Sequence, residues 1–505
     1  MRLSKLINGI YTKSLPVSFE DFDVSTISCD SREEQKNGLF VALAGAQFKG
    51  EDFIKDAMDK GAKVIVVASR HPEAVRPKDL KTPLDSSPLG LRMTTDNACV
   101  LEVDDPKYFL YCIGQRFYGN PSDKIKSVGV TGTNGKTTIT YLIESIIHAA
   151  FKRCGVIGTV NYRIGEKILP SKNTTPGFLD NQRFLAQLVG WGVDYSVMEA
   201  SSHALDQGRL EGVNFSAGIF TNLTQDHLDY HKDMEAYFGA KSLLFKNLSS
   251  TAVSIVNVDD EYGRRLRPIC QSHSFTYAID SPADVRAQNI NYHLSGTYFE
   301  IIFPEGAIKV HTRFIGKHNV YNILAAFAWG LSEDFSPEII RQGIENLSHV
   351  PGRLEGLEND KGIFIFIDYA HTEDGLVNVL KSLRAVTLMK IILVFGCGGD
   401  RDRTKRPKMG RAACELADYS FVTSDNPRSE DPQAIIDEVI TGFTKENYET
   451  CVDRKEAIGR ALKLAQRDQI VLIAGKGHED YQVFKDRTIS FNEREIVKDL
   501  INTRC

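Results

Sequence analysis

Short apolar runs alternate with amphipathic stretches along most of the chain. The apolar run 125–130 leads into a glycine-punctuated turn, and residues 138–150 then carry apolar side chains at helical spacing. Amphipathic stretches predict helices at 53–60 and 236–245. Further apolar runs predict strands at residues 38–43, 64–67, 192–199, 215–221, 253–257, 362–367, 391–395, 420–423 and 470–474. Strands that alternate with helices indicate an α/β fold with mostly parallel sheets.

Polar side chains follow many of the predicted strands. Glu199 ends one strand, and His227 lies in the polar segment after another. In the last third of the chain, four strands each lead into a polar loop, at residues 368–371, 396–401, 425–428 and 475–479. Ligands of parallel sheets collect beyond the carboxyl ends of the strands, so these loops are candidate binding segments.

The turn after residue 130 has the composition of a phosphate-binding loop. Its residues, 132–138, have the sequence Gly-Thr-Asn-Gly-Lys-Thr-Thr. Backbone N–H groups and the helix dipole favour an anion at such a helix start. Lys136 is suited to terminal phosphates and the Thr137 hydroxyl to Mg²⁺. Val130 stands where the strict P-loop pattern has glycine. The alternative is a chance glycine turn, which the strand–loop–helix context disfavours.

Composition narrows the function classes. The chain has 505 residues, enough for about three domains, and is 42% apolar and 25% charged. A net charge of -5 does not indicate that the chain binds nucleic acid. The nine cysteines form no CxxC pair, which fits reduced thiols in the cytoplasm. No apolar run has membrane-spanning length, and the start lacks a signal-peptide core. Residues 71–96 are rich in Pro, Ser, Thr and charge, and predict a surface loop.

A series of motifs in a fixed order resembles the Mur ligase family along nearly the whole chain. These motifs are Asp30-Ser31-Arg32, 132–138, 173–176, 199–203, 221–223, 226–231, 316–319, 351–353, 368–371, 425–428 and 475–479. The tetrapeptide Asp425-Asn426-Pro427-Arg428 is similar to the signature of the diaminopimelate-adding members.

The resemblance implies three domains. They are an α/β N-terminal UDP-substrate domain (1–105), a central P-loop-type ATPase domain with a mostly parallel sheet (106–345), and a C-terminal Rossmann-like amino-acid domain (346–505). It implies a cytoplasmic ATP-dependent amide ligase of peptidoglycan precursor synthesis. This enzyme would add meso-diaminopimelate to the D-glutamate of UDP-MurNAc-L-Ala-D-Glu through an acyl phosphate. We expect a monomer that needs Mg²⁺, with neither nucleic acid nor membrane as partner. The alternatives are a lysine-adding or folylpolyglutamate-type ligase, and a nucleotide-dependent switch.

The resemblance also assigns the nucleotide and metal sites. ATP would contact Gly132, Thr133, Asn134, Gly135, Lys136, Thr137, Thr138, Asn319, Arg353 and Asp368. Metal would be held by Thr137, Glu199, His227 and a carbamate on Lys241. The catalytic residues would be Lys136, Lys241, His227 and Glu199. Three simpler alternatives stay open: Asn319 as the N-cap of a helix over 320–331, His227 as a hydrogen-bonded loop histidine, and Glu199 as a surface carboxylate.

Lys241 lies in the amphipathic stretch 236–245, where a lysine is ordinarily solvated. The family carries a lysine in this setting that reacts with CO₂. Only a neutral amine can do so, and burial must therefore lower its pKa. We predict this modification for Lys241.

By resemblance, two groups of residues bind the other substrates. Ser31 would lie near the uridine, and Thr174, Thr175, Ser202, Gln207 and Arg209 around the sugar and peptide, although single Ser or Thr residues can equally be caps or turn residues. The distal end of meso-diaminopimelate bears both an ammonium and a carboxylate, so a selective pocket needs a cation fork and an acceptor. Arg428 would supply the fork. The pocket would be completed by Arg401, Asp425, Asn426, Gly475 and Glu479.

Overall fold

The computed structural model describes residues 1–12, 20–45, 49–69, 91–93, 98–164, 167–171 and 173–502, with backbone only at 91–93. The chain divides into two compact units. The first unit consists of Met1–Ser127, Thr175–Ser196 and His203–Phe215. The second unit consists of Val128–Thr174, Val197–Ser202 and Ser216–Cys505.

The first unit is built on a sheet with strand order β1-β2-β3-β5-β4. Its strands are parallel except for the antiparallel pair β4 and β5. They span β1 (Thr26–Ser28), β2 (Gly38–Val41), β3 (Ala62–Ala68), β4 (Leu91–Met93) and β5 (Cys99–Val103). The helices are α1 (Leu3–Ile7), α2 (Ile54–Asp59), α3 (Pro106–Phe117) and α5 (Phe178–Gly190), with 3₁₀ turns at Gly50–Phe53 and Pro121–Asp123.

The apolar faces of these elements form two cores. The larger one has the fully buried side chains Leu3, Val64 and Leu101, and the smaller one includes Phe40, Ala57 and Ile65. The predicted loop over 71–96 lies outside the described residues except at Leu91–Met93. There the prediction was wrong, because this segment pairs with β5 as a strand. The partner strand β5 lies outside the segment 71–96, so the composition of that segment alone could not indicate the pairing.

The described part of the second unit contains a large sheet with the order β16-β15-β14-β13-β12-β11-β6-β10-β7-β8-β9. The pairs from β11 to β14 are parallel, whereas β14–β16 and β7–β9 form antiparallel meanders. The strands on one side are β6 (Lys126–Thr131), β7 (Cys154–Ile157), β8 (Asn161–Ile164), β9 (Lys167–Pro170) and β10 (Tyr195–Glu199). The others are β11 (Phe215–Phe220), β12 (Val253–Asn257), β13 (His273–Ala278), β14 (Val285–His293), β15 (Gly296–Phe303) and β16 (Gly306–Thr312).

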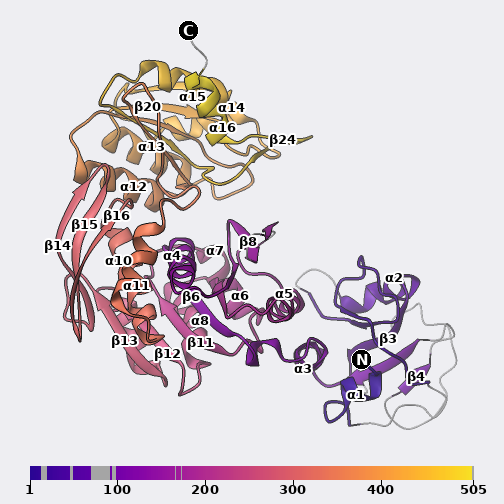
Figure 1. The fold of residues 1–505 in the computed structure, drawn as a ribbon. Helices are drawn as coiled ribbons and strands as arrows, with labels where there is room; N and C mark the ends of the chain where they lie inside the picture. The colour runs from indigo at the N-terminus through magenta and orange to yellow at the C-terminus, as the bar shows by residue number, and fades with distance from the viewer. Residues whose placement is uncertain are drawn as a thin grey trace. The chain divides into compact units, whose positions relative to one another are not determined.

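Helices cover this sheet. Helix α4 packs against both α10 and α11 (Figure 1). The amphipathic stretch around Lys241 is helical, as predicted. The helices are α4 (Lys136–Ala149), α7 (Leu228–His231), α8 (Met234–Lys246), α9 (Glu261–Leu266), α10 (Lys317–Ser332) and α11 (Pro337–Asn346), with a 3₁₀ turn at Arg267–Ile269. Helix α6 (Ser202–Asp206) begins in this unit, and its residues from His203 on belong to the first unit.

The C-terminal part of the second unit has a sheet with the order β17-β18-β22-β19-β20-β21. All its pairs are parallel except β17 with β18. The strands are β17 (Glu355–Leu357), β18 (Phe364–Asp368), β19 (Ile391–Phe395), β20 (Tyr419–Thr423), β21 (Tyr448–Cys451) and β22 (Ile470–Ala474), beside a hairpin of β23 (Tyr481–Val483) and β24 (Thr488–Ser490). The helices are α12 (Glu373–Val386), α13 (Lys405–Leu416), α14 (Pro432–Ile440), α15 (Arg454–Leu464) and α16 (Glu493–Asn502).

These sheets confirm the predicted α/β class with mostly parallel pairing. Strands β18, β19, β20 and β22 are buried along nearly their whole length, because helices pack on both faces of the sheet. Their carboxyl ends therefore present the four polar loops at one edge. Among the described residues, every helix is too short or too polar to cross a membrane.

Candidate functional site

The turn between β6 and α4 has a backbone that only glycine accommodates at two positions. Gly132 has φ +147°, and a Cβ there would lie 1.8 Å from the Thr221 hydroxyl oxygen. Gly135 has φ +92°, and a Cβ there would lie 2.4 Å from Asn322 Oδ1. The Asn134 N–H donates to Asn222 Oδ1 at 3.0 Å, which fixes the middle of the turn. The predicted phosphate loop therefore has a closely supported shape at the start of a helix.

Two lysine side chains meet at this loop. Lys136 Nζ donates to the carbonyl oxygens of Gly132 and Thr133, both at 2.9 Å. Lys241 Nζ, from α8, donates to the same Gly132 oxygen at 2.8 Å. Burial lowers the pKa of both amino groups, that of Lys241 well below its usual value. The charge of Lys136 lowers the pKa of Lys241 further. The loop thus concentrates positive charge that an anion would stabilise.

A buried carboxylate faces the first turn of α4. Glu199, at the end of β10, is 1% exposed and accepts a hydrogen bond from the Thr137 hydroxyl at 3.0 Å. Thr159 donates to it twice, from its N–H and its hydroxyl, both at 2.9 Å. The surface-carboxylate alternative for Glu199 is therefore wrong. A hydroxyl and a carboxylate side by side form a donor set that suits Mg²⁺.

His227 lies on the loop between β11 and α7. It has φ 54°, and its side chain is 48% exposed. Its Nε2 is 3.5 Å from Asp226 Oδ2. In the described part of the chain, no three His, Cys, Asp or Glu side chains are grouped as a metal site. The metal role predicted for His227 stays a prediction, and any ion here would need oxygen ligands from substrate or water as well.

Asn319 lies inside the first turn of α10. The N-cap of this helix is Gly316. The alternative that Asn319 caps this helix was therefore wrong. Its Nδ2 donates to Ile315 O at 2.9 Å, and its Oδ1 accepts from Asn322 Nδ2 at 3.1 Å. The helix starts earlier than the apolar spacing suggested because the glycine, with φ 98°, allows the chain to turn into it.

Arg353 lies just before β17, and Asp368 is the last residue of β18. Arg353 Nη2 donates to the Thr137 hydroxyl at 3.4 Å, and its guanidinium lies over the Tyr369 ring, 5.2 Å from the centroid. Asp368 accepts from the N–H groups of Leu354 at 2.6 Å and Ala370 at 2.8 Å. Burial raises the pKa of Asp368, and Arg353 opposes that rise. The structure therefore brings Arg353 to the helix start that follows the phosphate loop.

The residues predicted for the amino acid gather at the carboxyl edge of the C-terminal sheet. Asn426 Nδ2 donates to Glu479 Oε2 at 2.9 Å. Arg428 has φ 52°, and its Nη1 donates to Gly399 O at 2.6 Å. Asp425 Oδ2 is buried with no hydrogen-bond partner in the described structure, and it would lie 2.8 Å from a Cβ on Gly475.

Arg401 lies apart from those contacts. Its side chain is exposed, and Nη1 donates to the carbonyl of Asp400 at 3.2 Å. The loop that carries it begins directly after β19, next to the residues named above. A role for Arg401 in the pocket stays a prediction.

The residues predicted for the UDP-sugar and peptide divide between the two units. In the first unit, Ser31 is buried near the Asp30–Arg32 ion pair, and Arg209 donates to Thr175 O at 3.1 Å and to Gln207 Oε1. In the second unit, Thr174 accepts from the Thr159 hydroxyl at 3.1 Å. Ser202 is 2% exposed, and its hydroxyl has no hydrogen-bond partner in the described structure.

Sequence reasoning missed Thr159 and Lys476. Thr159 follows a short strand and carries no motif, so nothing in the sequence indicated its bonds to Glu199. Lys476 lies inside the motif 475–479, yet one of its two partners, Asn426, is fifty positions away. Its buried Nζ lies 3.1 Å from Asn426 Oδ1 and 3.2 Å from Glu479 Oε2.

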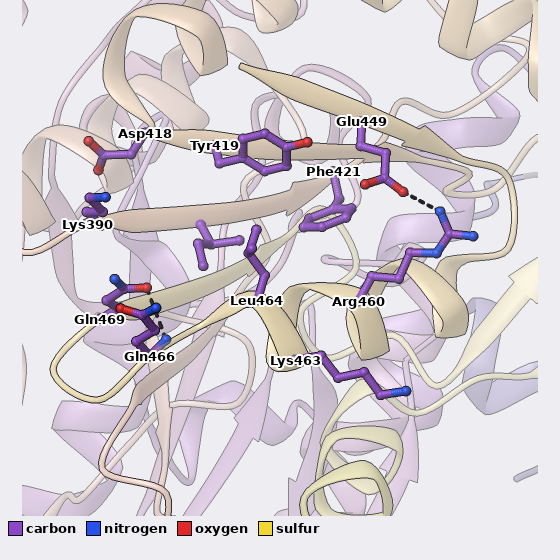
Figure 2. Close-up of a pocket in the computed structure, with 11 residues that line it drawn as sticks. Lys390, Asp418, Tyr419, Phe421, Glu449, Arg460, Lys463, Leu464, Gln466 and Gln469 are labelled. Carbon is purple, nitrogen blue, oxygen red and sulfur yellow. Dashed lines mark hydrogen bonds and ion pairs between the residues drawn. The ribbon is translucent and has the colours of Figure 1, made fainter. Parts of the chain in front are cut away.

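A separate pocket opens at the opposite edge of the C-terminal sheet, where the strands begin (Figure 2). Arg460 pairs with Glu449 at its rim, and the Gln466 N–H donates to Gln469 Oε1 at 3.1 Å. None of the predicted site residues lines it. Its lining consists of Lys390, Ile392, Asp418, Tyr419, Phe421, Glu449, Arg460, Lys463, Leu464, Gln466 and Gln469.

Three family profiles match successive parts of the chain. The Mur ligase family catalytic domain matches residues 23–96, the Mur ligase middle domain matches 130–330, and the Mur ligase glutamate ligase domain matches 352–477. The matches follow the order of the three domains that the motifs suggested.

Known proteins are similar along the full length. A UDP-N-acetylmuramoyl-L-alanyl-D-glutamate–2,6-diaminopimelate ligase from Clostridium tetani is 41% identical over 503 residues, 99% of each chain. The ligase of the same name from Geobacter metallireducens is 43% identical over 500 residues, 94% of this chain and 93% of that one. A solved structure of a ligase with that name is 30% identical, has a TM-score of 0.68 and covers 99% of both chains.

Proposed function

Since the chain belongs to the Mur ligase family, we propose that it is an ATP-dependent acid–amino-acid ligase that forms ADP and phosphate. Its substrates are UDP-MurNAc-L-Ala-D-Glu and meso-diaminopimelate, and its product is the UDP-MurNAc-tripeptide. The observation that carries the proposal is the arrangement around Thr137. Its hydroxyl contacts both the buried Glu199 and Arg353, and Thr137 directly follows Lys136 of the phosphate loop.

The reaction has two covalent steps. A carboxylate oxygen of the D-glutamate attacks the γ-phosphorus of ATP, and the bond from that phosphorus to the bridging oxygen breaks, which releases ADP. The neutral amine of the amino acid then attacks the acyl carbon, and the carbon–oxygen bond to phosphate breaks. Phosphate leaves with that electron pair, and the amine's proton passes to solvent. The first step brings two anions together, the carboxylate and the triphosphate, so fixed cations lower its barrier.

The chain's own cations fit the first step. Lys136 reaches into the turn that would hold the phosphates, and Arg353, from the segment before β17, contacts Thr137 at the helix start that follows this turn. Asn319 would contact the adenine and Asp368 the ribose. The backbone N–H groups of 132–138 would bind phosphate oxygens.

The donors around Thr137 fit Mg²⁺. Mg²⁺ in such sites is bound by few protein groups and by substrate phosphates, and here Thr137, Glu199 and His227 would hold it. When bound, Mg²⁺ would neutralise charge on the transferring phosphoryl group.

Lys241 is suited to carbamate formation because burial keeps its pKa low, so the neutral amine is accessible. The amine nitrogen attacks the carbon of CO₂ and loses one proton, which gives an anionic carbamate. That anion would offset the positive charge of Lys136 and offer oxygen ligands to a second Mg²⁺. The two lysines share the Gly132 oxygen, which supports this proposal.

Substrate recognition divides between two sets of residues. Arg428 would bind the distal carboxylate of meso-diaminopimelate and Glu479 its distal ammonium, with Asp425, Asn426, Gly475 and Arg401 around them. Ser31, Thr174, Thr175, Ser202, Gln207 and Arg209 would bind the nucleotide-sugar and its peptide.

We propose the domain boundaries 1–105, 106–345 and 346–505, a cytoplasmic location and a monomeric state. In that setting the enzyme would supply a peptidoglycan precursor and so support cell shape and division. Limited proteolysis tests the boundaries, and light scattering tests the monomer.

A phosphate-release assay tests the function. Purified protein is given ATP, Mg²⁺ and UDP-MurNAc-L-Ala-D-Glu, with meso-diaminopimelate, L-lysine or no amino acid. We expect release only with an amino acid and strong preference for diaminopimelate. Preference for lysine would indicate a lysine-adding ligase, and release without any amino acid would indicate a nucleotide switch. Activity on a folate in place of the UDP-sugar would indicate a folylpolyglutamate-type ligase.

A further inference from the structure

Lys476 is the buried centre of a closed group of polar side chains. Its side chain is fully buried, its Nζ contacts Asn426 Oδ1 at 3.1 Å and Glu479 Oε2 at 3.2 Å, and it lies 5.6 Å from the centroid of the Tyr481 ring. Asn426 Nδ2 donates to the same Glu479 oxygen at 2.9 Å. Each of the three side chains therefore holds the other two.

These contacts fix the orientation of two groups. Asn426 Oδ1 accepts from Lys476 and from the Val483 N–H at 3.0 Å, so the amide cannot turn over without losing both bonds. Glu479 Oε2 is engaged by Lys476 and Asn426. The other carboxylate oxygen of Glu479, Oε1, can therefore accept a hydrogen bond from an incoming ammonium. Its direction is set by the two contacts of Oε2.

The same hairpin strand connects this group to Arg428. The Arg428 N–H donates to Val483 O at 3.0 Å, while the Val483 N–H donates to Asn426. Gln482 Nε2 donates to Asp425 O at 2.6 Å. The loop after β20 and the segment after β22 are thus tied together by β23.

The charges of this cluster, defined as Asp425, Asn426, Arg428, Lys476 and Glu479, sum to zero. The cluster contains two cations, Arg428 and Lys476, and two carboxylates, Asp425 and Glu479. The neighbouring buried ion pair, Arg454 with Glu493 at 2.7 Å, is balanced in itself. A neutral cluster matches a distal group that carries both an ammonium and a carboxylate. A distal ammonium alone would leave one cation of the cluster without a partner.

We propose that Lys476 is a specificity-determining positioning residue, which orients Glu479 and sets the cluster's net charge to suit a zwitterionic distal end rather than a cationic one. This inference rests on the proposed function. Without Lys476 the cluster carries one excess negative charge, and a cationic side chain such as that of lysine gains relative to meso-diaminopimelate.

The test compares kcat/KM for meso-diaminopimelate with kcat/KM for L-lysine. In Lys476→Met the ratio is expected to shift toward lysine on the order of tenfold, because one nearby charge has been removed. Lys463→Met, an exposed lysine at the other edge of the sheet, is the matched control and should keep the wild-type ratio. An equal loss with both amino acids, or an unchanged ratio, would overturn the inference.

A second variant covers the case in which Lys476→Met fails to fold. Glu479→Gln leaves Lys476 in place and makes the cluster net positive, so the ratio should move the opposite way, toward diaminopimelate. The double variant Lys476→Met/Glu479→Gln should return toward the wild-type ratio. A ratio for Glu479→Gln that moves toward lysine contradicts the charge argument. Wild-type protein inactive with diaminopimelate would instead refute the proposed function, and this inference with it.

Discussion

The phosphate loop and the carboxyl edge of the C-terminal sheet, both in the second unit, differ in how their charged side chains are paired. At the phosphate loop, Lys136 and Lys241 donate to one carbonyl oxygen, and in the described structure neither forms an ion pair. At the C-terminal edge, Lys476 is paired with Glu479, and the buried Arg406 with Glu430 and Glu438. At the first edge burial lowers the pKa of Lys136, and Glu199 and Asp226 oppose this without forming an ion pair with it, whereas Lys476 and Arg406 at the second edge are directly paired.

The difference indicates what each edge is built to bind. Buried amines outside ion pairs are costly to protonate, so a site that keeps them gains most from a highly charged anion such as a triphosphate. A balanced cluster gains little from net charge. It selects by the positions of donors and acceptors instead. We therefore expect the first edge to drive the reaction and the second to choose the amino acid.

Removing a phosphate-loop cation should have the largest effect on activity. Lys136→Met is expected to lower kcat about 10³-fold, because a cation aimed at transferring phosphate is lost. Its free energy of unfolding should stay equal or rise, because burial disfavours the charged amine and lowers its pKa. Phosphate release and urea unfolding measure the two effects. Lys152→Met, an exposed lysine, is the control. A variant that is destabilised yet active would contradict the comparison.

Lys241→Ala sharpens the same point. We expect a loss of activity on the order of 10²-fold or more, since the carbamate can no longer form. A short carboxylic acid added to the assay should restore part of the activity, because its carboxylate can occupy the vacated volume. Full activity of the alanine variant would end the carbamate proposal.

At the balanced edge, Arg428→Ala should lower kcat/KM for meso-diaminopimelate about 10²-fold, through loss of a charged bidentate contact. The affinity for ADP, measured by calorimetry, should not change. Arg428→Lys keeps the charge without the bidentate fork, so its kcat/KM should lie between those of the wild type and Arg428→Ala. Arg487→Ala, an exposed arginine, serves as the control. Unchanged diaminopimelate kinetics would remove Arg428 from the pocket.

The smallest expected effect concerns pH. Burial, with Arg353 nearby, lowers the pKa of His478 to about 4. Between that value and the ordinary histidine pKa of about 6.5, the unfolded chain binds the proton and the folded chain does not. The free energy of unfolding therefore keeps its full value above the ordinary histidine pKa, and it falls as the pH is lowered toward 4. Urea unfolding at pH 7 and pH 5 should show this loss, and His478→Asn should reduce it. An identical loss in both proteins would contradict the assignment.

The sequence predicted the parts of the fold that are local. The apolar runs located the buried strands, and the polar segments after them correctly indicated the loops around Glu199, Asp368 and Asn426. What it could not predict depends on distant pairing. Leu91–Met93 becomes a strand only because β5 is beside it, and the start of α10 is set by the positive φ of Gly316.

The same limit applies within the site. The motif 475–479 indicated that Lys476 lies at a strand end, but not that it holds Asn426 and Glu479 together. Thr159 carries no motif and becomes visible only through its bonds to Glu199. Burial of Lys241 was predicted from resemblance, and the structure supplies its physical origin in the packing of α8.

The most direct test of the account follows one oxygen atom. UDP-MurNAc-L-Ala-D-Glu labelled with ¹⁸O in the D-glutamate side-chain carboxylate is incubated with ATP, Mg²⁺, meso-diaminopimelate and the protein, and the released phosphate is analysed by mass spectrometry. If an acyl phosphate forms, one labelled oxygen from the carboxylate appears in phosphate for each amide bond made. Phosphate that carries no label, with its new oxygen drawn from water, would contradict the account.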